Sequence, residues 1–244
     1  MIDLTARVAL VTGGSRGIGR AIALALANAG AAVAVNYHER ERLAAELVES
    51  VRAGGRRAIA VGVDVSSRPA VEAMVRQVEA ELGPIDVLIN NAGVAPIRGL
   101  DELTDEDFDR TIAVNLKSAF LCTSAVLPHM RANRWGRIVN ISSVAARGGG
   151  AIGVHYNASK AGLEGLTRGY ASRLAGEGVT VNAVAPGLID TDMAAPLKQA
   201  GQAARIPVGR FGLVDEIADA VLMVVGNAFI TGQTIAVNGG LLFT

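Results

Sequence analysis

The chain has 244 residues, of which 50% are hydrophobic and 19% charged, so it can build a large buried core. Its 23 basic and 23 acidic residues cancel, and aromatic residues make up only 4%. With no basic field and few stacking side chains, nucleic acid is not expected as a partner. The single cysteine, Cys122, excludes an intramolecular disulfide and is typical of a reducing compartment.

The apolar stretches along the chain are short. A membrane span needs roughly 18 to 20 apolar residues, so no span is expected. The N-terminus also lacks the basic and then apolar sequence of a secretory signal. We therefore expect a soluble protein of the cytoplasm.

Runs of aliphatic and β-branched residues recur at 8–11, 32–35, 58–61, 87–90, 138–141, 179–182 and 234–237. They are continuously apolar rather than alternating, which indicates parallel strands buried on both faces. Between them, segments such as 39–53 and 69–82 show the pattern of amphipathic helices. The sequence thus predicts an α/β fold, a doubly wound (Rossmann) parallel sheet of seven strands with helices on both faces. No linker interrupts this pattern, so we expect a single domain over residues 1–244.

A glycine-rich turn, TGGSRGIG at 12–19, follows the first strand and opens a helix rich in Ala and Leu. Glycines permit a sharp turn and let the backbone approach a pyrophosphate closely, which then binds free N–H groups at the helix N-terminus. Placed after the first strand, the turn predicts a nicotinamide dinucleotide site. Its expected contacts are Gly13, Ser15, Arg16, Gly17, Ile18 and Gly19.

The same turn also contains G-x-S-x-G at 13–17, the pattern of a serine hydrolase nucleophile elbow. Such an elbow normally follows several strands, whereas this turn follows the first. No histidine occurs in the last third of the chain to complete a triad. The context favours the cofactor turn, and a hydrolase remains an alternative that cofactor-free ester hydrolysis would support.

The end of the second strand indicates which dinucleotide binds. In NAD sites, a carboxylate about 20 residues further on holds the ribose hydroxyls. Here that position is Tyr37, and His38 and Arg40 could surround a 2′-phosphate together with Arg16. We therefore expect both Tyr37 and His38 to contact the cofactor and NADP(H) to be favoured. NAD(H) is the alternative because Glu39 lies nearby and a histidine, unlike an arginine, is not permanently charged.

Three polar residues predict a catalytic group. Tyr156 and Lys160 share a helix face, and Ser143 follows a strand whose carboxyl end should open into the same crevice. Reducing a carbonyl requires a hydride at carbon and a proton at oxygen. A free phenol has a pKa of about 10. The Lys160 ammonium is expected to lower the pKa of Tyr156, so that this residue acts as general acid or base. Ser143 would donate a hydrogen bond to the substrate oxygen.

Taken in order, these motifs resemble those of the short-chain dehydrogenase/reductase family. The resemblance rests on residues 12–19, NNAG at 90–93, NISS at 140–143, YNASK at 156–160, Pro186-Gly187 and NGG at 238–240, nearly the whole chain. It implies that Asn115 completes a Ser–Tyr–Lys–Asn tetrad, its backbone holding a water that links Lys160 to solvent. From the residues alone, this asparagine would face solvent or mark a kink.

The resemblance implies further cofactor contacts. Asp64 and Val65 look like a pair that touches adenine, and Asn91, Ala92 and Gly93 match a turn that lines the cofactor. Tyr156 and Lys160 also count among the cofactor contacts, Lys160 by holding the nicotinamide ribose. After Pro186 and Gly187, both also expected in the site, Ile189 and Thr191 resemble contacts to the carboxamide. No metal is expected.

Within this family the likeness is greatest to 3-oxoacyl-[acyl-carrier-protein] reductases, through the chain length, VAPGLIDTDM at 184–193 and VNGG at 237–240. It implies NADP(H)-dependent reduction of a carbonyl, as a small molecule or acyl thioester, to a secondary alcohol. Acyl carrier protein is a candidate partner. Arg134 falls where a basic docking residue is usual, whereas Glu177, where another is expected, would repel an acidic partner.

Two alternatives stay open. One is a reductase or dehydrogenase of free small ketones or secondary alcohols, NAD-linked in some cases, and the other is a dinucleotide sensor without activity. The presence of Ser143, Tyr156 and Lys160 together argues against the sensor. Because members of the family are usually homotetramers, the resemblance also implies that assembly. The segment 194–211 is expected to cover the substrate as a lid.

Overall fold

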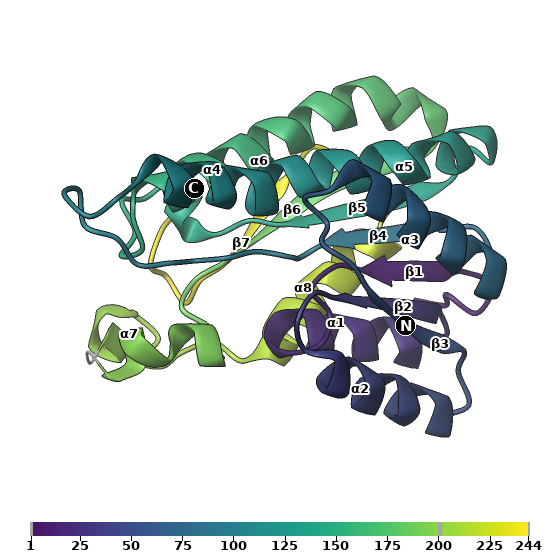
Figure 1. The fold of residues 1–244 in the computed structure, drawn as a ribbon, viewed down its shortest axis with the longest axis horizontal. Helices are drawn as coiled ribbons and strands as arrows, with labels where there is room; N and C mark the ends of the chain where they lie inside the picture. The colour runs from purple at the N-terminus through teal and green to yellow at the C-terminus, as the bar shows by residue number, and fades with distance from the viewer. Residues whose placement is uncertain (1, 200–201, 244) are drawn as a thin grey trace.

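The computed structural model describes residues 2–199 and 202–243. Its centre is a seven-stranded parallel sheet with the strand order β3-β2-β1-β4-β5-β6-β7 (Figure 1). The strands are β1 (Val8–Val11), β2 (Ala32–Tyr37), β3 (Ala58–Gly62), β4 (Val87–Asn90), β5 (Gly136–Ile141), β6 (Val179–Pro186) and β7 (Thr234–Val237). The seven predicted strands and the doubly wound parallel sheet are confirmed.

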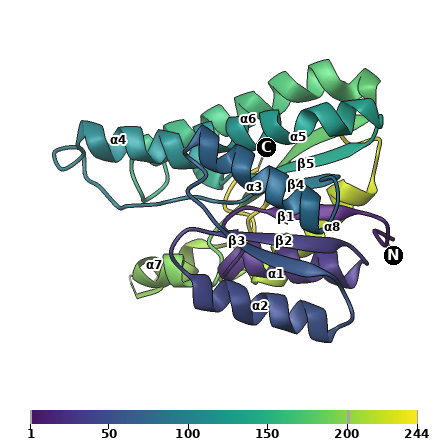
Figure 2. The same ribbon diagram turned by 45° about the vertical axis from the view of Figure 1, so that its right-hand side comes forward.

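Helices cover both faces of the sheet, as Figure 2 shows from the side. One face carries α1 (Gly17–Asn28), α2 (Glu41–Ala53) and α8 (Val214–Gly226), and the other carries α3 (Arg68–Glu81), α5 (Ser118–Ala132) and α6 (Val154–Leu174). The first strand shows how the two layers arise. Ala9 and Val11 join the core beneath α1, whereas Leu10 joins the core beneath α5, because successive side chains of a strand point to opposite faces.

Two segments depart from this simple alternation. A π-helical turn, Ala113–Lys117, joins α4 (Asp105–Ile112) to α5. After β6 the chain forms short helical turns and α7 (Ala195–Gln199), which stand apart from the sheet on the side of the strands' carboxyl ends (Figure 1). This outlying segment includes most of the predicted lid, and it has a small apolar cluster of its own, built on Ala194, Ile206 and Phe211.

The continuous helical run Asp105–Ala132 is long and apolar enough to cross a membrane by length and composition alone. It joins apolar stretches that are individually too short for a span. Within the fold, Leu121, Cys122 and Val126 of this run are buried in the core beneath α5. A core helix passes the same length test, so the run by itself is weak evidence for a membrane span.

Candidate active site

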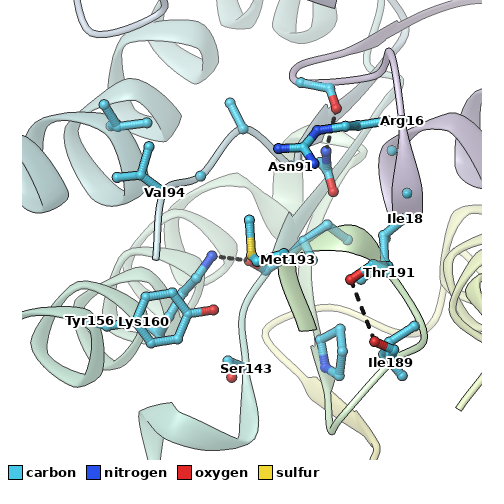
Figure 3. A pocket seen from close by; sticks show the side chains of 18 of the residues that line it. Arg16, Ile18, Asn91, Val94, Ser143, Tyr156, Lys160, Ile189, Thr191 and Met193 are labelled. Atoms are coloured by element: carbon cyan, nitrogen blue, oxygen red, sulfur yellow. Dashed lines mark hydrogen bonds between the residues drawn. The ribbon is translucent and has the colours of Figure 1, made fainter. Parts of the chain in front are cut away.

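A pocket of about 630 Å³ lies at the carboxyl ends of β1, β4, β5 and β6, the edge at which ligands of open parallel sheets bind (Figure 3). With the exception of Asn115, the predicted site residues line it. They are Gly13, Ser15, Arg16, Gly17, Ile18, Gly19, Tyr37, His38, Asp64, Val65, Asn91, Ala92, Gly93, Ser143, Tyr156, Lys160, Pro186, Gly187, Ile189 and Thr191. Segments far apart in the sequence therefore meet in one cavity.

The glycine turn packs so tightly on the segment after β4 that no side chain fits at Gly13 or Gly19. Gly13 has φ of 60°, and a Cβ there would lie 2.9 Å from Cα of Ala92. A Cβ on Gly19 would lie 2.5 Å from Nδ2 of Asn91. That same Asn91 amide donates to the carbonyl oxygens of Thr12, at 3.0 Å, and Gly13, at 2.9 Å. Glycine is therefore required at 13 and 19 for packing and backbone conformation.

The start of α1 leaves backbone donors free. The helix begins at Gly17 after Arg16 in extended conformation, and among the described residues no side chain caps it. The first N–H groups of a helix have no partner within it, and the helix dipole makes this end positive. Together with the close-packed glycines, these donors fit the pyrophosphate of a dinucleotide.

Asn36, near the end of β2, supports this turn and was missed by the sequence analysis. Its side-chain oxygen accepts from the N–H of Gly13 at 3.2 Å, and its backbone oxygen accepts from Gly14 at 2.9 Å. Its amide nitrogen lies within 3.2 Å of the carbonyl oxygens of Val61 and Val63. It is only 2% exposed. The available signal was a polar residue within an otherwise apolar strand.

The ribose end of the pocket has no carboxylate at the position of Tyr37. The Tyr37 ring lies against β3, where a Cβ on Gly62 would come within 2.8 Å of it. Burial, and then Glu41, raise the pKa of this phenol. The side chains of His38 and Arg40 follow along the pocket lining. Arg16 reaches across to the outlying segment, where its Nη1 lies 3.3 Å from Oδ2 of Asp192.

Asp64 and Val65 line the far end of the pocket, beyond β3. The Asp64 carboxylate accepts from the N–H of Ser66 at 2.8 Å. Burial raises the pKa of this carboxyl, but hydrogen bonds from Ser66 and nearby positive charges together leave the pKa below its ordinary value. Arg110 of α4 also lines this end and contributes to that lowering. Periodicity gave no reason to single out Arg110.

Ser143, Tyr156 and Lys160 lie together on one side of the pocket, with Ile189 and Thr191 across from them (Figure 3). Tyr156 and Lys160 project from α6, and Ser143 precedes the 3-10 turn Val144–Ala146. The Lys160 ammonium donates to the carbonyl oxygen of Ile141 at 2.8 Å and lies 5.7 Å from the centroid of the Tyr156 ring. The predicted catalytic side chains are thus close enough to act on one substrate atom.

Burial dominates the pKa values of this group. It lowers the pKa of the Lys160 ammonium to about 8, because a buried cation loses hydration. Burial also raises the pKa of the Tyr156 phenol, and a hydrogen bond with Ser143 only partly opposes this. The prediction of a lowered phenol pKa is therefore wrong. The ammonium is bonded to Ile141 rather than to the phenol oxygen, so loss of hydration outweighs its attraction.

Asn115 lies outside the pocket lining, in the π-helical turn, and is 2% exposed. Its side chain accepts from the N–H of Val94 at 2.8 Å and donates to the carbonyl of Val94 at 3.0 Å and to Ser159 at 3.1 Å. It therefore fastens the segment after Gly93 to α6. The π-helical turn interrupts the regular α-helix at this residue. A solvent-facing side chain is wrong, and the kink and the relay water stay predictions.

The last predicted contacts follow β6. A Cβ on Gly187 would lie 2.8 Å from Cα of Asn238, so this glycine permits close passage of two chain segments. Beyond it, the Thr191 hydroxyl lies 3.5 Å from the carbonyl oxygen of Ile189 (Figure 3). Thr191 also faces Gly17 across the pocket, at 3.4 Å from the position of a Cβ there. The two sides of the pocket therefore nearly touch at this point.

The fold and the pocket define a class of protein that comparison with known sequences identifies. Residues 7–202 match the family model described as short chain dehydrogenase. The chain belongs to the short-chain dehydrogenase family, as its motifs predicted, and it is an oxidoreductase.

Individual relatives match over nearly the full chain. A 3-oxoacyl-[acyl-carrier-protein] reductase from Synechocystis sp. is 43% identical, with 99% of each chain covered. The (2S)-[(R)-hydroxy(phenyl)methyl]succinyl-CoA dehydrogenase subunit BbsD of Thauera aromatica is 43% identical, with 96% of each covered. The crystal structure of a blue fluorescent protein from a metagenomic library, in complex with NADPH, is 40% identical with a TM-score of 0.92, covering 98% of this chain and 99% of that one.

The lowered pKa of Lys160 predicts that activity in the reducing direction falls as the pH rises through about 8. The ammonium favours the negative charge that develops on Tyr156, and this support is present below that pH and lost above it. The measurement is kcat/KM against pH. In Lys160→Arg the charge persists, so the decline should move to higher pH. Activity that stays constant from about pH 7 to about pH 10 in the unaltered enzyme would contradict this assignment.

A second prediction concerns Asn36. Asn36→Leu removes the acceptor of the Gly13 N–H, so the Kd for the nicotinamide cofactor should rise about tenfold, or about 1.4 kcal/mol, with kcat little changed. Cofactor titration by fluorescence measures this. Asn182→Leu is the matched control, because Asn182 is an equally buried strand asparagine that bonds Ile230 and Gln233 instead. Equal losses of affinity in both variants would refute a specific role for Asn36.

Proposed function

We propose that the protein is an NADP(H)-dependent reductase that converts a carbonyl group to a secondary alcohol, with a 3-oxoacyl thioester as its substrate. The observation that carries this proposal is the meeting of Ser143, Tyr156 and Lys160 with the glycine turn in one pocket. The names of the relatives from Synechocystis and Thauera, both of which contain an acyl thioester or acyl carrier, support the substrate class.

A nicotinamide held in this pocket would supply the hydride, and the side chains of this chain would supply the proton. Tyr156 donates its proton to the substrate oxygen. Its raised pKa keeps the phenol protonated near neutral pH, so it releases the proton only when the oxygen gains negative charge. Ser143 donates a hydrogen bond to the same oxygen, and the Lys160 ammonium favours the phenolate that forms. A phenol that holds its proton suits reduction better than oxidation.

The charges at the ribose end support NADP(H). A carboxylate that would hold the ribose hydroxyls of NAD is missing at Tyr37, while Arg16, His38 and Arg40 line this end of the pocket. Arginine is well suited to a phosphate because its guanidinium offers several donors in one plane. The NADPH in the related crystal structure also supports this choice. Glu39 lines the same end, so NAD(H) remains the alternative cofactor.

The pocket outside the cofactor contacts supports an uncharged substrate. Its apolar lining there includes Val94, Val144, Ala145, Ala151, Ile152, Leu188, Met193 and Ala194, while Ser142 and Asp192 are polar members of the lining. An acyl chain attached to a thioester fits such a wall, whereas a free carboxylate would lose hydration without gaining a partner. A free small ketone or secondary alcohol also fits, so a reductase or dehydrogenase of such compounds is the alternative.

Acyl carrier protein is the proposed carrier of the thioester. The carboxylate of Glu177, expected to repel it, pairs with Arg131, whose Nη2 lies 3.1 Å from Oε1. Hydrogen bonding to Arg131 lowers the pKa of Glu177. Arg134 lies beside this pair and donates to the carbonyl of Gly176 at 2.9 Å. Arg131, Arg134 and Glu177 together therefore carry a net positive charge, which suits an acidic partner.

We also propose that the chain acts as one dinucleotide-binding and catalytic domain over residues 1–244, in the cytoplasm, and as a homotetramer. The sheet ends in β7, which is not fully buried, and Phe229 and Phe243, which flank β7 in the sequence, are 99% and 87% exposed. Large apolar side chains at such exposure are typical of a subunit interface. The balanced charge gives no reason to expect nucleic acid as a partner, and the packed core positions of α5 argue against a membrane.

Turnover with NADPH and with NADH, over 3-oxoacyl thioesters and simple ketones, tests the proposed activity. NADPH should be preferred by about tenfold or more, and Tyr156→Phe should lower kcat by about 10²–10⁴ with cofactor binding intact. A tenfold preference for NADH would contradict the cofactor assignment. Cofactor-free ester hydrolysis would indicate a hydrolase, and cofactor binding without turnover of any carbonyl would indicate a sensor.

Charge reversal at Arg134 tests the carrier. Arg134→Glu should raise KM for a 3-oxoacyl group on acyl carrier protein by about tenfold, because like charges repel across the contact. It should leave KM for the same acyl group on N-acetylcysteamine unchanged. Arg42→Glu, on the exposed surface of α2, is the control for net charge. If Arg134→Glu changes both substrates equally, the arginine does not contact the carrier.

A further inference from the structure

A buried carboxylate lies behind the proposed catalytic residues. Glu164 of α6 is 4% exposed, and it follows Lys160 by four residues and Tyr156 by eight, so all three share a helix face. Burying a carboxylate is costly unless charged and hydrogen-bonded partners compensate it. The partners of Glu164 come from the segment that carries Ser143.

The segment that carries Ser143 runs from Ser142 to Arg147, and both of these end residues contact the Glu164 carboxylate. Nε of Arg147 donates to Oε2 at 2.9 Å. The Ser142 hydroxyl lies 3.3 Å from Oε1 and 3.4 Å from the carbonyl oxygen of Lys160, and it can donate to one of them at a time. Ser142 directly precedes Ser143, and Arg147 follows it by four residues. The two contacts therefore bracket Ser143.

The bracketed segment also has bonds of its own. The N–H of Ala145 donates to the Ser143 hydroxyl at 3.1 Å, and the N–H of Ala146 donates to the Ser143 carbonyl at 3.0 Å. These bonds shape the 3-10 turn but do not join it to α6. Behind the pocket, the contacts of Glu164 with Ser142 and Arg147 join the turn to α6. Further along the chain, the Asn157 amide of α6 donates to the carbonyl oxygens of Gly148, at 2.8 Å, and Gly149, at 2.7 Å.

We propose that Glu164 and Arg147 form a clamp that positions the Ser143 hydroxyl relative to Tyr156 and Lys160. The clamp acts on the reaction through Ser143, which must meet the substrate oxygen together with the Tyr156 phenol. Displacements on the order of 1 Å at such a group slow catalysis strongly. The kinetic part of this proposal rests on the proposed reductase function, whereas the positioning itself does not.

A second arginine offers a matched control. Nη1 of Arg168 lies 4.0 Å from Oε2 of Glu164, so it contributes charge to the same carboxylate. It belongs to α6 itself and is 60% exposed in its side chain, so it cannot hold the Ser143 segment. Arg147, with a side chain 37% exposed, makes the shorter contact and bridges the two elements.

Five variants, one of them a control, test the clamp by kinetics. Glu164→Gln and Arg147→Met should each lower kcat for carbonyl reduction about tenfold, while KM for the cofactor stays within about twofold. The double variant should be no slower than the slower single variant, because both changes break one contact. Arg147→Lys keeps the charge and should restore part of the loss. Arg168→Gln should behave like the unaltered enzyme.

Hydrogen exchange measured by mass spectrometry tests the positioning without any turnover. Amides of residues 142–147 should exchange faster in Glu164→Gln and Arg147→Met than in the unaltered protein, because this part of the turn loses its contact with Glu164. The same amides should be unchanged in Arg168→Gln. Arg147→Met alters a partly exposed side chain, so it carries the test even if Glu164→Gln does not fold.

The outcomes separate the clamp from the reaction. An active enzyme in which kcat and exchange are the same in Arg147→Met as in the unaltered protein refutes the clamp and leaves the reductase function intact. Equal effects of Arg147→Met and Arg168→Gln refute it too, since they indicate a general charge effect. Faster exchange in an enzyme that reduces no carbonyl supports the clamp and refutes the proposed function.

Discussion

The parallel pairing of the strands is the constraint on which the rest of the structure depends. Because all seven strands run in one direction, the segments that leave them meet at one edge of the sheet. The glycine turn leaves β1, the Asn91 segment leaves β4, and Ser143 leaves β5. Helices cover both faces of the sheet and exclude water from them, so a ligand can reach the sheet only at that edge.

Burial at this edge has opposite effects on neighbouring groups. It lowers the pKa of Lys160 to about 8 and raises that of Tyr156, so each group is biased towards its uncharged form. Polar contacts then determine which of the buried groups on α6 are stabilised in their charged form. Lys160 keeps a carbonyl acceptor, and Glu164, one turn further along the same helix, keeps an arginine. The two buried charges of α6 are thus held by different partners rather than by each other.

Much of the fold could be derived from the sequence, because strand periodicity and the glycine turn are local patterns. The pocket lining beyond that turn was predicted largely through the resemblance to short-chain dehydrogenases. Contacts between residues that are distant in the sequence do not follow from such local patterns. Asn36 supports Gly13 from 23 residues away, and Arg131 neutralises Glu177 from 46 residues away. The predicted direction of the Tyr156 pKa shift was wrong for the same reason. The shift depends on how many atoms exclude water around the phenol and on where the Lys160 ammonium is bonded.

The support that Asn36 gives to the glycine turn separates two tasks that lie side by side in the sequence. In the part of the chain described, the turn is held by Asn36 and Asn91, while the side chains of Tyr37 and His38 make no hydrogen bond to it. Substitutions of Tyr37 and His38 can therefore alter the choice of cofactor while the glycine turn stays intact. Such a division allows natural or engineered variants to exchange NADP(H) for NAD(H) without a change in the fold of the turn.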